Sequence, residues 1–178
     1  VCISSNPDEL ETCERIVLPG DGAFVSGMEN LRERGLIDPL RREVIEKGKP
    51  FLGICLGMQL LARKGWEGRE CPGLNWINAE VKPLEVQAQG LRVPHMGWNE
   101  LVLQSESVLA SDLDCEPVFY FIHGYHLIPD DSTIVKAICD YGVSIASVLE
   151  FDNIFATQFH PEKSQKAGLQ ILRNFVNY

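Results

Sequence analysis

Short apolar runs alternate with helically spaced apolar positions along the first part of the chain. Residues 15–18 predict a strand that ends at a Pro-Gly-Asp-Gly turn. From residue 28 to about 47, apolar side chains recur at the helical period, with Gly35 dividing two helices and Gly48 closing the second. A buried strand over residues 51–54 and a helix over residues 56–63 follow. This order predicts a parallel sheet with helices on its faces.

The second half of the chain is dominated by strand-like runs. Residues 64–78 are glycine-rich and polar, so they are expected to form a loop. Asp140-Tyr141-Gly142 fits a hairpin turn, and residues 163–176 predict a closing amphipathic helix. The predicted strands are residues 79–84, 100–103, 118–122, 133–138, 144–149 and 154–159. We therefore expect a single α/β domain over residues 1–178, with a parallel sheet extended by antiparallel strands.

Composition narrows the range of partners. The 178 residues carry a net charge of −9, from 16 Lys+Arg against 25 Asp+Glu, and no basic stripe, which argues against nucleic-acid binding. No run of about 18 apolar residues predicts a membrane span, and no signal peptide is recognised. The six cysteines form no zinc-like spacing with the four histidines, so we expect no metal and a cytoplasmic protein with reduced thiols. The cysteines are Cys2, Cys13, Cys55, Cys71, Cys115 and Cys139.

One cysteine stands in a distinctive local pattern. Gly53-Ile54-Cys55-Leu56-Gly57 lies where a predicted strand meets a predicted helix, which is the arrangement of a nucleophile elbow. Such a turn strains the nucleophile backbone, needs small residues on either side and places the thiol at a helix N-terminus, where the dipole favours thiolate. The N–H of Leu56 is then placed to donate to an oxyanion. A buried structural cysteine between two glycines is the alternative.

A base for this thiol is available near the end of the chain. His160 ends an apolar strand, Pro161 stops regular strand pairing, and Glu162 can reach back to the imidazole. Alternatively, His160 is structural and Glu162 only opens the last helix, where an acidic residue is favourable.

The other histidines give weaker signals. His123 and His126 lie three apart in a strand-like region and face opposite sides, so they are discounted as a metal site. His95 lies in a turn-like segment, residues 93–99, which is either an ordinary surface loop or a partner-binding loop. The turn at residues 19–22 can present backbone N–H groups to an anion, although the pattern alone favours a plain turn.

Five segments taken together resemble class I (triad) glutamine amidotransferases. They are residues 18–24 (LPGDGAF), 28–31 (MENL), 49–60 (KPFLGICLGMQL), 93–99 (VPHMGWN) and 157–164 (TQFHPEKS). The cysteine and histidine segments are typical of the whole class. The PHMGWN segment is more narrowly similar to the glutaminase subunits of imidazole glycerol phosphate synthase. The resemblance spans nearly the whole chain and implies a flavodoxin-like fold.

The resemblance also implies roles for the matching residues. Cys55 attacks the side-chain amide of glutamine, His160 transfers the proton, Glu162 orients His160, and water hydrolyses the resulting thioester. The ammonia is channelled to a (β/α)₈-barrel cyclase, in a heterodimer that makes imidazole glycerol phosphate for histidine biosynthesis, and no cofactor is needed. The implied oxyanion and substrate contacts are Gly20, Asp21, Gly22, Leu56, Gln59, His123, Gly124 and Tyr125. The implied partner contacts are His95, Met96, Trp98, Asn99 and Lys163.

Three departures from the family pattern bear on these roles. The family begins with a further strand and helix that this sequence lacks, so we expect a truncated sequence. Asp21 stands where the family has a small apolar residue, and an acid beside an oxyanion disfavours it unless only its N–H is used. Gly124 replaces a Ser or Thr, which removes one hydroxyl contact.

Three other functions fit the same motifs. The chain could be a paralogous glutaminase that supplies another acceptor enzyme, for example one that amidates a sugar nucleotide. It could be a γ-glutamyl hydrolase or peptidase that needs no partner. It could also be a catalytically silent binding protein. Activity on glutamine, activity on γ-glutamyl peptides and labelling of Cys55 by a glutamine-like electrophile separate these possibilities.

Overall fold

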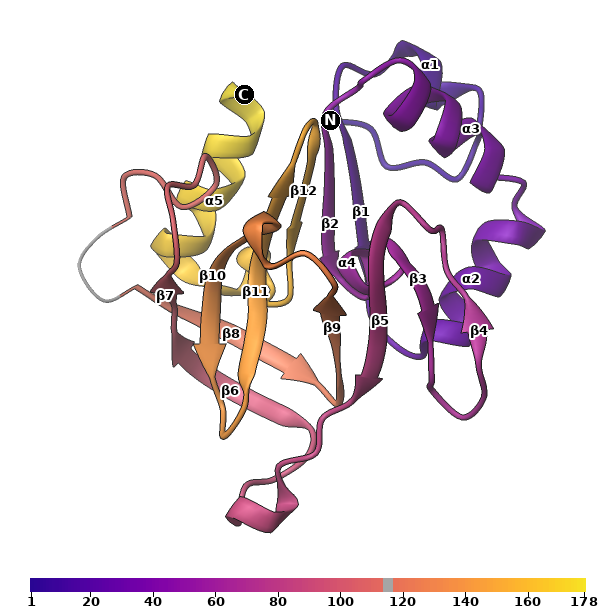
Figure 1. Ribbon diagram of the computed structural model, residues 1–178. Coiled ribbons are helices and arrows are strands. Elements are labelled where there is room, and N and C mark those ends of the chain that lie inside the picture. The colour runs from indigo at the N-terminus through magenta and orange to yellow at the C-terminus, as the bar shows by residue number, and fades with distance from the viewer. Residues whose placement is uncertain (114–116) are drawn as a thin grey trace.

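A six-stranded sheet forms the centre of the computed structural model, which describes residues 1–113 and 117–178 (Figure 1). Its strands, in spatial order, are β1 (Ile16–Gly20), β2 (Phe51–Cys55), β12 (Ile154–Thr157), β11 (Ser144–Phe151), β10 (Val135–Asp140) and β7 (Val102–Leu103). β2 pairs in parallel with β1 and β12, and the remaining neighbours are antiparallel. The predicted parallel sheet with an antiparallel extension is confirmed.

Helices form largely where the apolar period predicted them. α2 (Phe24–Glu33) and α3 (Ile37–Arg41) are separated at Gly35, whose φ of +64° is left-handed, and a π-helical turn over Arg42–Glu46 ends before Gly48. The closing helix is α5 (Gln165–Asn177), which starts later than predicted because Pro161–Lys163 form a 3₁₀ turn. α1 (Glu9–Thr12) is a short helix ahead of β1.

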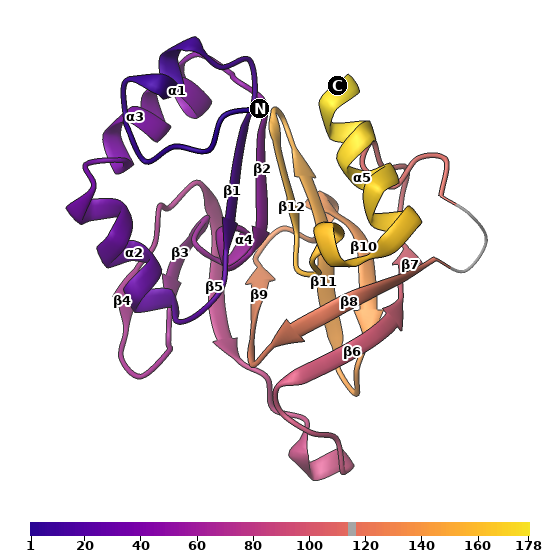
Figure 2. The same cartoon turned by 180° about the vertical axis from the view of Figure 1, so that it is seen from behind.

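Two apolar cores lie on either side of the central sheet. α5 packs against one face of the sheet (Figure 2). There the rings of Phe155 and Phe175 meet edge to face, with centroids 5.8 Å apart. On the other face, Phe24 and Met28 of α2 join the core around Phe51. A second sheet contributes to that core, with the strand order β4 (Cys71–Pro72), β3 (Ala62–Gly65), β5 (Ile77–Pro83) and β9 (Tyr125–Pro129).

The helix predicted over residues 56–63 is wrong in its second half. α4 covers only Leu56–Gln59, and the chain continues into strand β3. The carbonyl groups of Leu60 and Leu61 accept hydrogen bonds from the backbone N–H groups of Leu74 and Trp76, at 2.8 and 3.0 Å. Long-range pairing therefore overrides the local helical pattern. For the same reason the loop predicted over residues 64–78 contains β4 and the start of β5.

The turn-like interpretation of residues 93–99 is also wrong. His95–Glu100 form strand β6, which pairs antiparallel with β8 (Val118–His123) in a two-stranded ribbon. Its side chains alternate between a buried inner face and an exposed outer face, but histidine, glycine and asparagine occupy the inner positions. A polar inner face hides the apolar alternation that normally reveals a strand.

Smaller differences concern strand ends. The strand predicted over residues 133–138 begins at Val135 because Ser132–Ile134 form a 3₁₀ turn, and the last predicted strand stops at Thr157. A further 3₁₀ turn covers Gln87–Gln89, and strand β9 was not predicted. The hairpin turn between β10 and β11 is confirmed.

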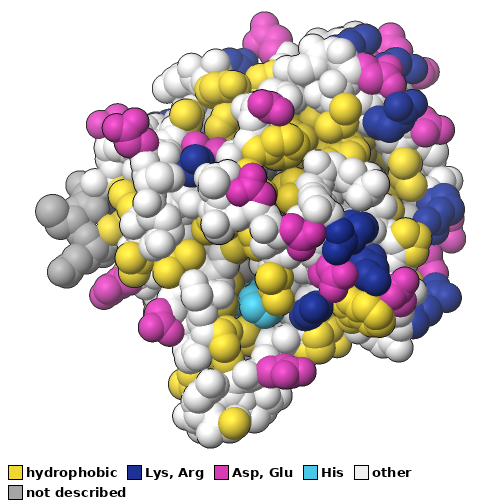
Figure 3. Space-filling view, in the orientation of Figure 1, with side chains coloured by type: hydrophobic (Ala, Val, Ile, Leu, Met, Phe, Trp, Pro, Cys, Tyr) yellow, Lys and Arg dark blue, Asp and Glu magenta, His cyan; other side chains and the backbone are white. Residues whose placement is uncertain are grey.

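Five of the six cysteines lie in the described part of the chain, and all five are free. Cys115 lies outside the described residues. On the face shown in Figure 3, Lys and Arg side chains are interspersed with Asp and Glu. Among the helices described, none has the length and hydrophobicity to traverse a bilayer.

Candidate active site

Cys55 occupies a strained turn between β2 and α4. Its backbone adopts φ 52° and ψ −106°, a conformation that non-glycine residues rarely take. A Cβ at Gly53 would lie 2.7 Å from the carbonyl oxygen of Gly57, and one at Gly57 would lie 1.9 Å from that of Leu18. Both glycines are therefore required by close backbone approach. The predicted strand-to-helix turn is confirmed.

The Cys55 thiol is buried and neutral in this environment. Burial raises its pKa to about 11, opposed by a hydrogen bond from the N–H of Leu56, while the carboxylates of Glu162 and Asp21 raise it further. The helix dipole was expected to favour the thiolate, but α4 has only four residues. Its dipole does not offset the cost of burying a charge. For Cys55 to act as a nucleophile, a nearby base would have to remove this proton.

His160 is held in the form that such a base requires. Its Nδ1 lies 2.7 Å from Oε1 of Glu162, and because a carboxylate only accepts, Nδ1 carries the hydrogen. The other ring nitrogen, Nε2, therefore has a free lone pair. Nε2 is buried and has no hydrogen-bond partner among the described residues. The predicted pairing of Glu162 with His160 is confirmed.

A cavity of about 190 Å³ brings the predicted cysteine and histidine together. The Sγ atom of Cys55 lies 3.9 Å from the carbonyl oxygen of Ile122 and 3.7 Å from Nε2 of Gln158. No hydrogen bond joins it to His160 within the part of the chain described. The cavity is lined by Asp21, Gly22, Cys55, Leu56, Gln59, Ile122, His123, Gly124, Tyr125, His160 and Lys163.

The predicted oxyanion and substrate residues surround this cavity with one exception. Gly20 is not part of the lining, although it lies opposite Cys55 in the register between β1 and β2. Lys163, predicted to contact a partner, also lines the cavity. Asp21 and Gly22 of the predicted turn therefore line the same cavity as Cys55.

Sequence reasoning missed Gln158. This side chain is fully buried, donates from Nε2 toward the sulfur of Cys55 and accepts at Oε1 from Nε2 of Gln59, at 3.0 Å. The alternation of side chains along a strand would have placed Gln158 on the same face as His160. That signal was present in the QFHPE segment.

The predicted partner-contact residues fall on opposite faces of the β6–β8 ribbon. Met96 and Trp98 are on the outer face, 59% and 44% exposed. Trp98 meets Tyr120 edge to face at 5.9 Å, and Lys163 places its ammonium 5.9 Å from the Tyr120 ring.

The prediction that His95 contacts a partner needs correction, because His95 lies on the inner face of the ribbon. This residue is only 1% exposed and is stacked between the rings of Phe121 and Tyr141. It therefore makes no direct contact with a partner from this position. Its Nε2 receives a hydrogen bond from Asn99, whose side chain is half-buried.

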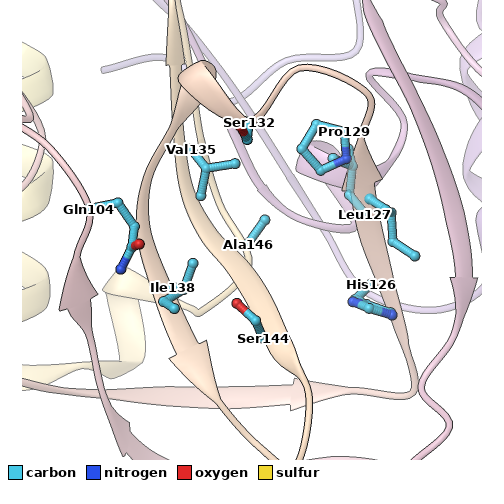
Figure 4. A pocket seen from close by; sticks show the side chains of 10 residues that line it. Gln104, His126, Leu127, Pro129, Ser132, Val135, Ile138, Ser144 and Ala146 are labelled. Carbon is cyan, nitrogen blue, oxygen red and sulfur yellow. The ribbon is translucent and has the colours of Figure 1, made fainter.

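A larger cavity of about 360 Å³ lies elsewhere, between β9, β10 and β11 (Figure 4). His126, Ser132, Ser144 and Gln104 give it some polar groups, but apolar side chains make up much of the rest. It contains none of the predicted site residues. Size alone therefore does not identify the site, whereas the placement of a nucleophile and a base does.

Comparison with known proteins agrees with this geometry. The sequence model of the family described as "Glutamine amidotransferase class-I" matches residues 3–178. A solved GMP synthase protein from Thermoplasma acidophilum, titled as putative, has a TM-score of 0.69 at 21% identity, covering 97% of this chain and 75% of its own. A structure titled glutamine amidotransferase has a TM-score of 0.68 at 21% identity, covering 98% and 83%. The chain belongs to the class-I glutamine amidotransferases, with their flavodoxin-like fold.

Curated relatives narrow the class. HisH 1, a subunit of imidazole glycerol phosphate synthase from Campylobacter jejuni (strain RM1221), is 44% identical over 98% of this chain and 86% of its own. The HisH subunit from Aquifex aeolicus is 45% identical over 98% and 83%. HisH 2 from Pseudomonas aeruginosa is 42% identical over 97% and 85%. Within the class, the chain is thus similar to the HisH subunits of imidazole glycerol phosphate synthase over nearly its whole length.

Proposed function

We propose that this chain is the glutaminase subunit of an imidazole glycerol phosphate synthase. It hydrolyses glutamine to glutamate and ammonia, and the ammonia passes to a (β/α)₈-barrel cyclase partner in histidine biosynthesis. One observation carries the proposal: Cys55, Leu56 and His160 line one cavity, and His160 has a carboxylate on Nδ1 and no partner on Nε2 among the described residues. The similarity to HisH subunits supports the choice of acceptor pathway.

The chemistry begins with proton transfer coupled to attack. Because the thiol pKa is about 11, the free thiolate is scarce at neutral pH, and Nε2 of His160 removes the proton as the sulfur approaches the amide carbon. Glu162 stabilises the imidazolium that forms. Cys55 and His160 line the same cavity, and this step requires the thiol to turn from the Ile122 carbonyl toward His160. The developing oxyanion is stabilised by the N–H of Leu56 and the backbone at residues 20–22.

The second half of the reaction returns the proton. The tetrahedral intermediate collapses, the carbon–nitrogen bond breaks, and the imidazolium of His160 donates its proton so that ammonia leaves. A water molecule, deprotonated by the same nitrogen, then attacks the thioester and releases glutamate. The carbon–sulfur bond breaks, and the imidazolium of His160 returns its proton to the sulfur, which regenerates the Cys55 thiol.

The walls of the cavity fit the amino-acid end of glutamine. Gln59 uses its Nε2 group to donate to the carbonyl of Tyr125 at 2.9 Å and to Gln158, which leaves its Oε1 for a ligand. A carbonyl-type oxygen suits the α-ammonium group. Lys163 supplies positive charge for the α-carboxylate. Gly124 offers only its backbone, so the side-chain hydroxyl found in the family has no equivalent here.

A docking surface for the cyclase is supported by the outer face of the β6–β8 ribbon. The exposed Met96 and Trp98 and the half-buried Tyr120 form an apolar and aromatic strip, and Lys163 lies beside Tyr120 and lines the cavity. Exposed aromatic residues and methionine are characteristic of protein interfaces. Because Lys163 also lines the cavity, a partner seated there would lie next to the active site. We place this heterodimer in the cytoplasm.

The proposed function is tested by the purified chain with glutamine, alone and with the cyclase subunit from the same organism. We expect glutamate release that rises when the cyclase is added, and none from Cys55→Ala. Cys71→Ala is the matched control, because Cys71 is a buried free cysteine outside the cavity. Full glutaminase activity in Cys55→Ala, or no activity in the wild-type pair, would rule the proposal out.

A second candidate function is a glutaminase that serves another acceptor enzyme. Asp21 and Gly124, which depart from the family pattern, are the observation that favours it. Activation by a synthetase-like partner and not by the cyclase would select it. Hydrolysis of γ-glutamyl peptides without hydrolysis of glutamine would instead indicate a peptidase.

A further inference from the structure

A buried chain of hydrogen bonds connects the β6–β8 ribbon to the nucleophile. We call it the buried relay, and its members in order are Asn99, His95, His123, the carbonyl of Tyr125, Gln59, Gln158 and Cys55. The heavy-atom distances are 2.7 Å from Asn99 to His95, 3.0 Å from His95 to His123 and 2.8 Å from His123 to Tyr125. They continue at 2.9 Å and 3.0 Å through Gln59 and end 3.7 Å from the sulfur.

The carbonyl of Tyr125 fixes the polarity of the relay on its histidine side. A carbonyl can only accept, so Nδ1 of His123 carries its hydrogen and Nε2 is an acceptor. Nδ1 of His95 must then donate to His123, and Nε2 of His95 must accept from Asn99. Burial lowers the pKa of His95 to about 4 and that of His123 to about 3, so both rings are neutral at pH 7.

The same carbonyl fixes the polarity on the glutamine side. Gln59 must present its NH₂ group to Tyr125, and the second hydrogen of that group faces Gln158. The atom of Gln158 that meets it must therefore be the oxygen. This turns the NH₂ group of Gln158 toward the sulfur of Cys55. The orientation of two buried amides and two imidazoles thus follows from one backbone oxygen.

We propose that Gln158 is a positioning residue for Cys55, and that the buried relay fixes the orientation in which its amide N–H donates to the sulfur. The inference rests on the proposed function, because it assigns a role at the same nucleophile. Gln158 does not line the cavity, so it acts through Cys55 and not on the substrate. A donor at the sulfur stabilises negative charge there when His160 removes the proton.

The first experiment measures the reactivity of Cys55 without requiring catalysis. The rate of carboxamidomethylation of Cys55 by iodoacetamide at pH 8 is followed by peptide mass spectrometry in the wild type and in Gln158→Met. Met has a similar length and lacks the donor. Loss of a hydrogen bond to a charged atom shifts a pKa by about one unit, so we expect the rate to fall about tenfold. Gln170→Met, on the half-buried surface of α5, is the matched control and should keep the wild-type rate.

Steady-state kinetics then separate positioning from binding. In the active complex, we expect Gln158→Met to lower kcat about tenfold and to leave KM within about twofold, because ground-state contacts with glutamine are intact. A rise in KM with unchanged kcat would overturn the assignment. So would an alkylation rate of Gln158→Met within twofold of the wild type.

The second experiment determines the tautomer of each of the four histidines at pH 7 by long-range ¹H–¹⁵N correlation spectroscopy. We expect His95 and His123 both as the Nδ1–H tautomer. Asn99→Asp replaces the donor by a group that can only accept, so Nε2 of His95 should gain a hydrogen. Gln104→Glu, which makes the same charge change at an exposed position, should not alter either ring.

The outcomes distinguish the inference from the proposed function. An Nε2–H tautomer at His123 in the wild type, or an unchanged His95 in Asn99→Asp, would overturn the relay. Both readouts are obtained on the isolated chain and need no turnover. A wild-type protein that releases no glutamate therefore refutes the proposed function, while the alkylation and tautomer results still decide the role of Gln158.

Discussion

Two groups of buried histidines in this protein have contrasting neighbours. His160 has a carboxylate on Nδ1 and no partner on Nε2 among the described residues, whereas His95 and His123 have both of their nitrogens engaged by imidazole, amide and carbonyl groups. All three rings are less than 9% exposed. Burial therefore does not separate the proposed base from the structural pair. The free lone pair and the acidic neighbour do, because they allow a proton to be taken up and its charge stabilised.

The largest expected effect comes from removing the free lone pair. His160→Gln should lower kcat for glutamate release by about 10³-fold, since proton transfer to and from the sulfur is lost. The urea midpoint should change little, because Nε2 makes no hydrogen bond within the described part of the chain and the glutamine amide can donate to the half-exposed Glu162 in place of Nδ1. Stopped glutaminase assays with the cyclase present check this. A variant that retains more than a tenth of the wild-type kcat would show that His160 is not the base.

For His95, whose ring nitrogens are both hydrogen-bonded, we expect substitution to lower the stability of the fold. His95→Leu leaves the Nε2 acceptor of His123 and the Asn99 amide without their partner in a buried region, which should cost about 2 kcal/mol in free energy of unfolding. Urea denaturation of the isolated chain measures this. Met96→Leu, on the exposed outer face of the same strand, should change the free energy of unfolding by less than about 0.5 kcal/mol. Equal effects of the two changes would contradict the contrast drawn between the faces.

Acid should weaken the paired region. Burial lowers the pKa of His95 to about 4 and that of His123 to about 3, both below the ordinary value of 6.5. Below pH 6.5 the unfolded chain binds protons that the folded chain does not, so stability present above pH 6.5 is lost as the pH falls. Each ring should contribute a slope of about 1.4 kcal/mol per pH unit between pH 6 and 5. Urea titrations at several pH values should show a shallower slope in His95→Leu, and an unchanged slope would disprove this linkage.

The smallest effect concerns a charge near the thiol. Asp21 raises the pKa of Cys55 through its negative charge, so Asp21→Asn should lower that pKa. Asp21 is exposed, and solvent screens the interaction, so we expect the alkylation rate of Cys55 to rise only about two- to threefold. Asp112→Asn is a matched exposed control that should have no effect. A slower rate in Asp21→Asn would reverse the sign of the proposed interaction.

The sequence predicted the parts of the fold that depend on local constraints. The turn at Cys55 was recognisable because close backbone contacts demand glycine at positions 53 and 57. The helix break at Gly35 and the hairpin at residues 140–142 were recognisable because both need a glycine with positive φ. In the site, the contact between His160 and Glu162 was predictable because the two residues are neighbours in the chain.

The parts that were missed depend on distant partners. Residues 60–63 were predicted as the end of a helix, but Leu74 and Trp76 donate hydrogen bonds to Leu60 and Leu61. Residues 95–100 look like a loop because their inner positions are polar, and those polar groups are satisfied only by β8 and β9. The role of Gln158 was hidden for the same reason, since its partners Gln59 and Cys55 are far away in the sequence. Strand alternation places Gln158 on the face of His160, but no local pattern identifies these distant partners.

The carbonyl of Tyr125 has a consequence for variation in this protein. Its oxygen belongs to the main chain, so no side-chain exchange at position 125 deletes it. The aromatic ring could be replaced by another residue that fills the same space while the backbone acceptor stays where His123 and Gln59 need it. Adding or removing a residue beside Gly124 would displace it at once. Substitutions at position 125 should therefore be tolerated, whereas insertions or deletions beside Gly124 should not.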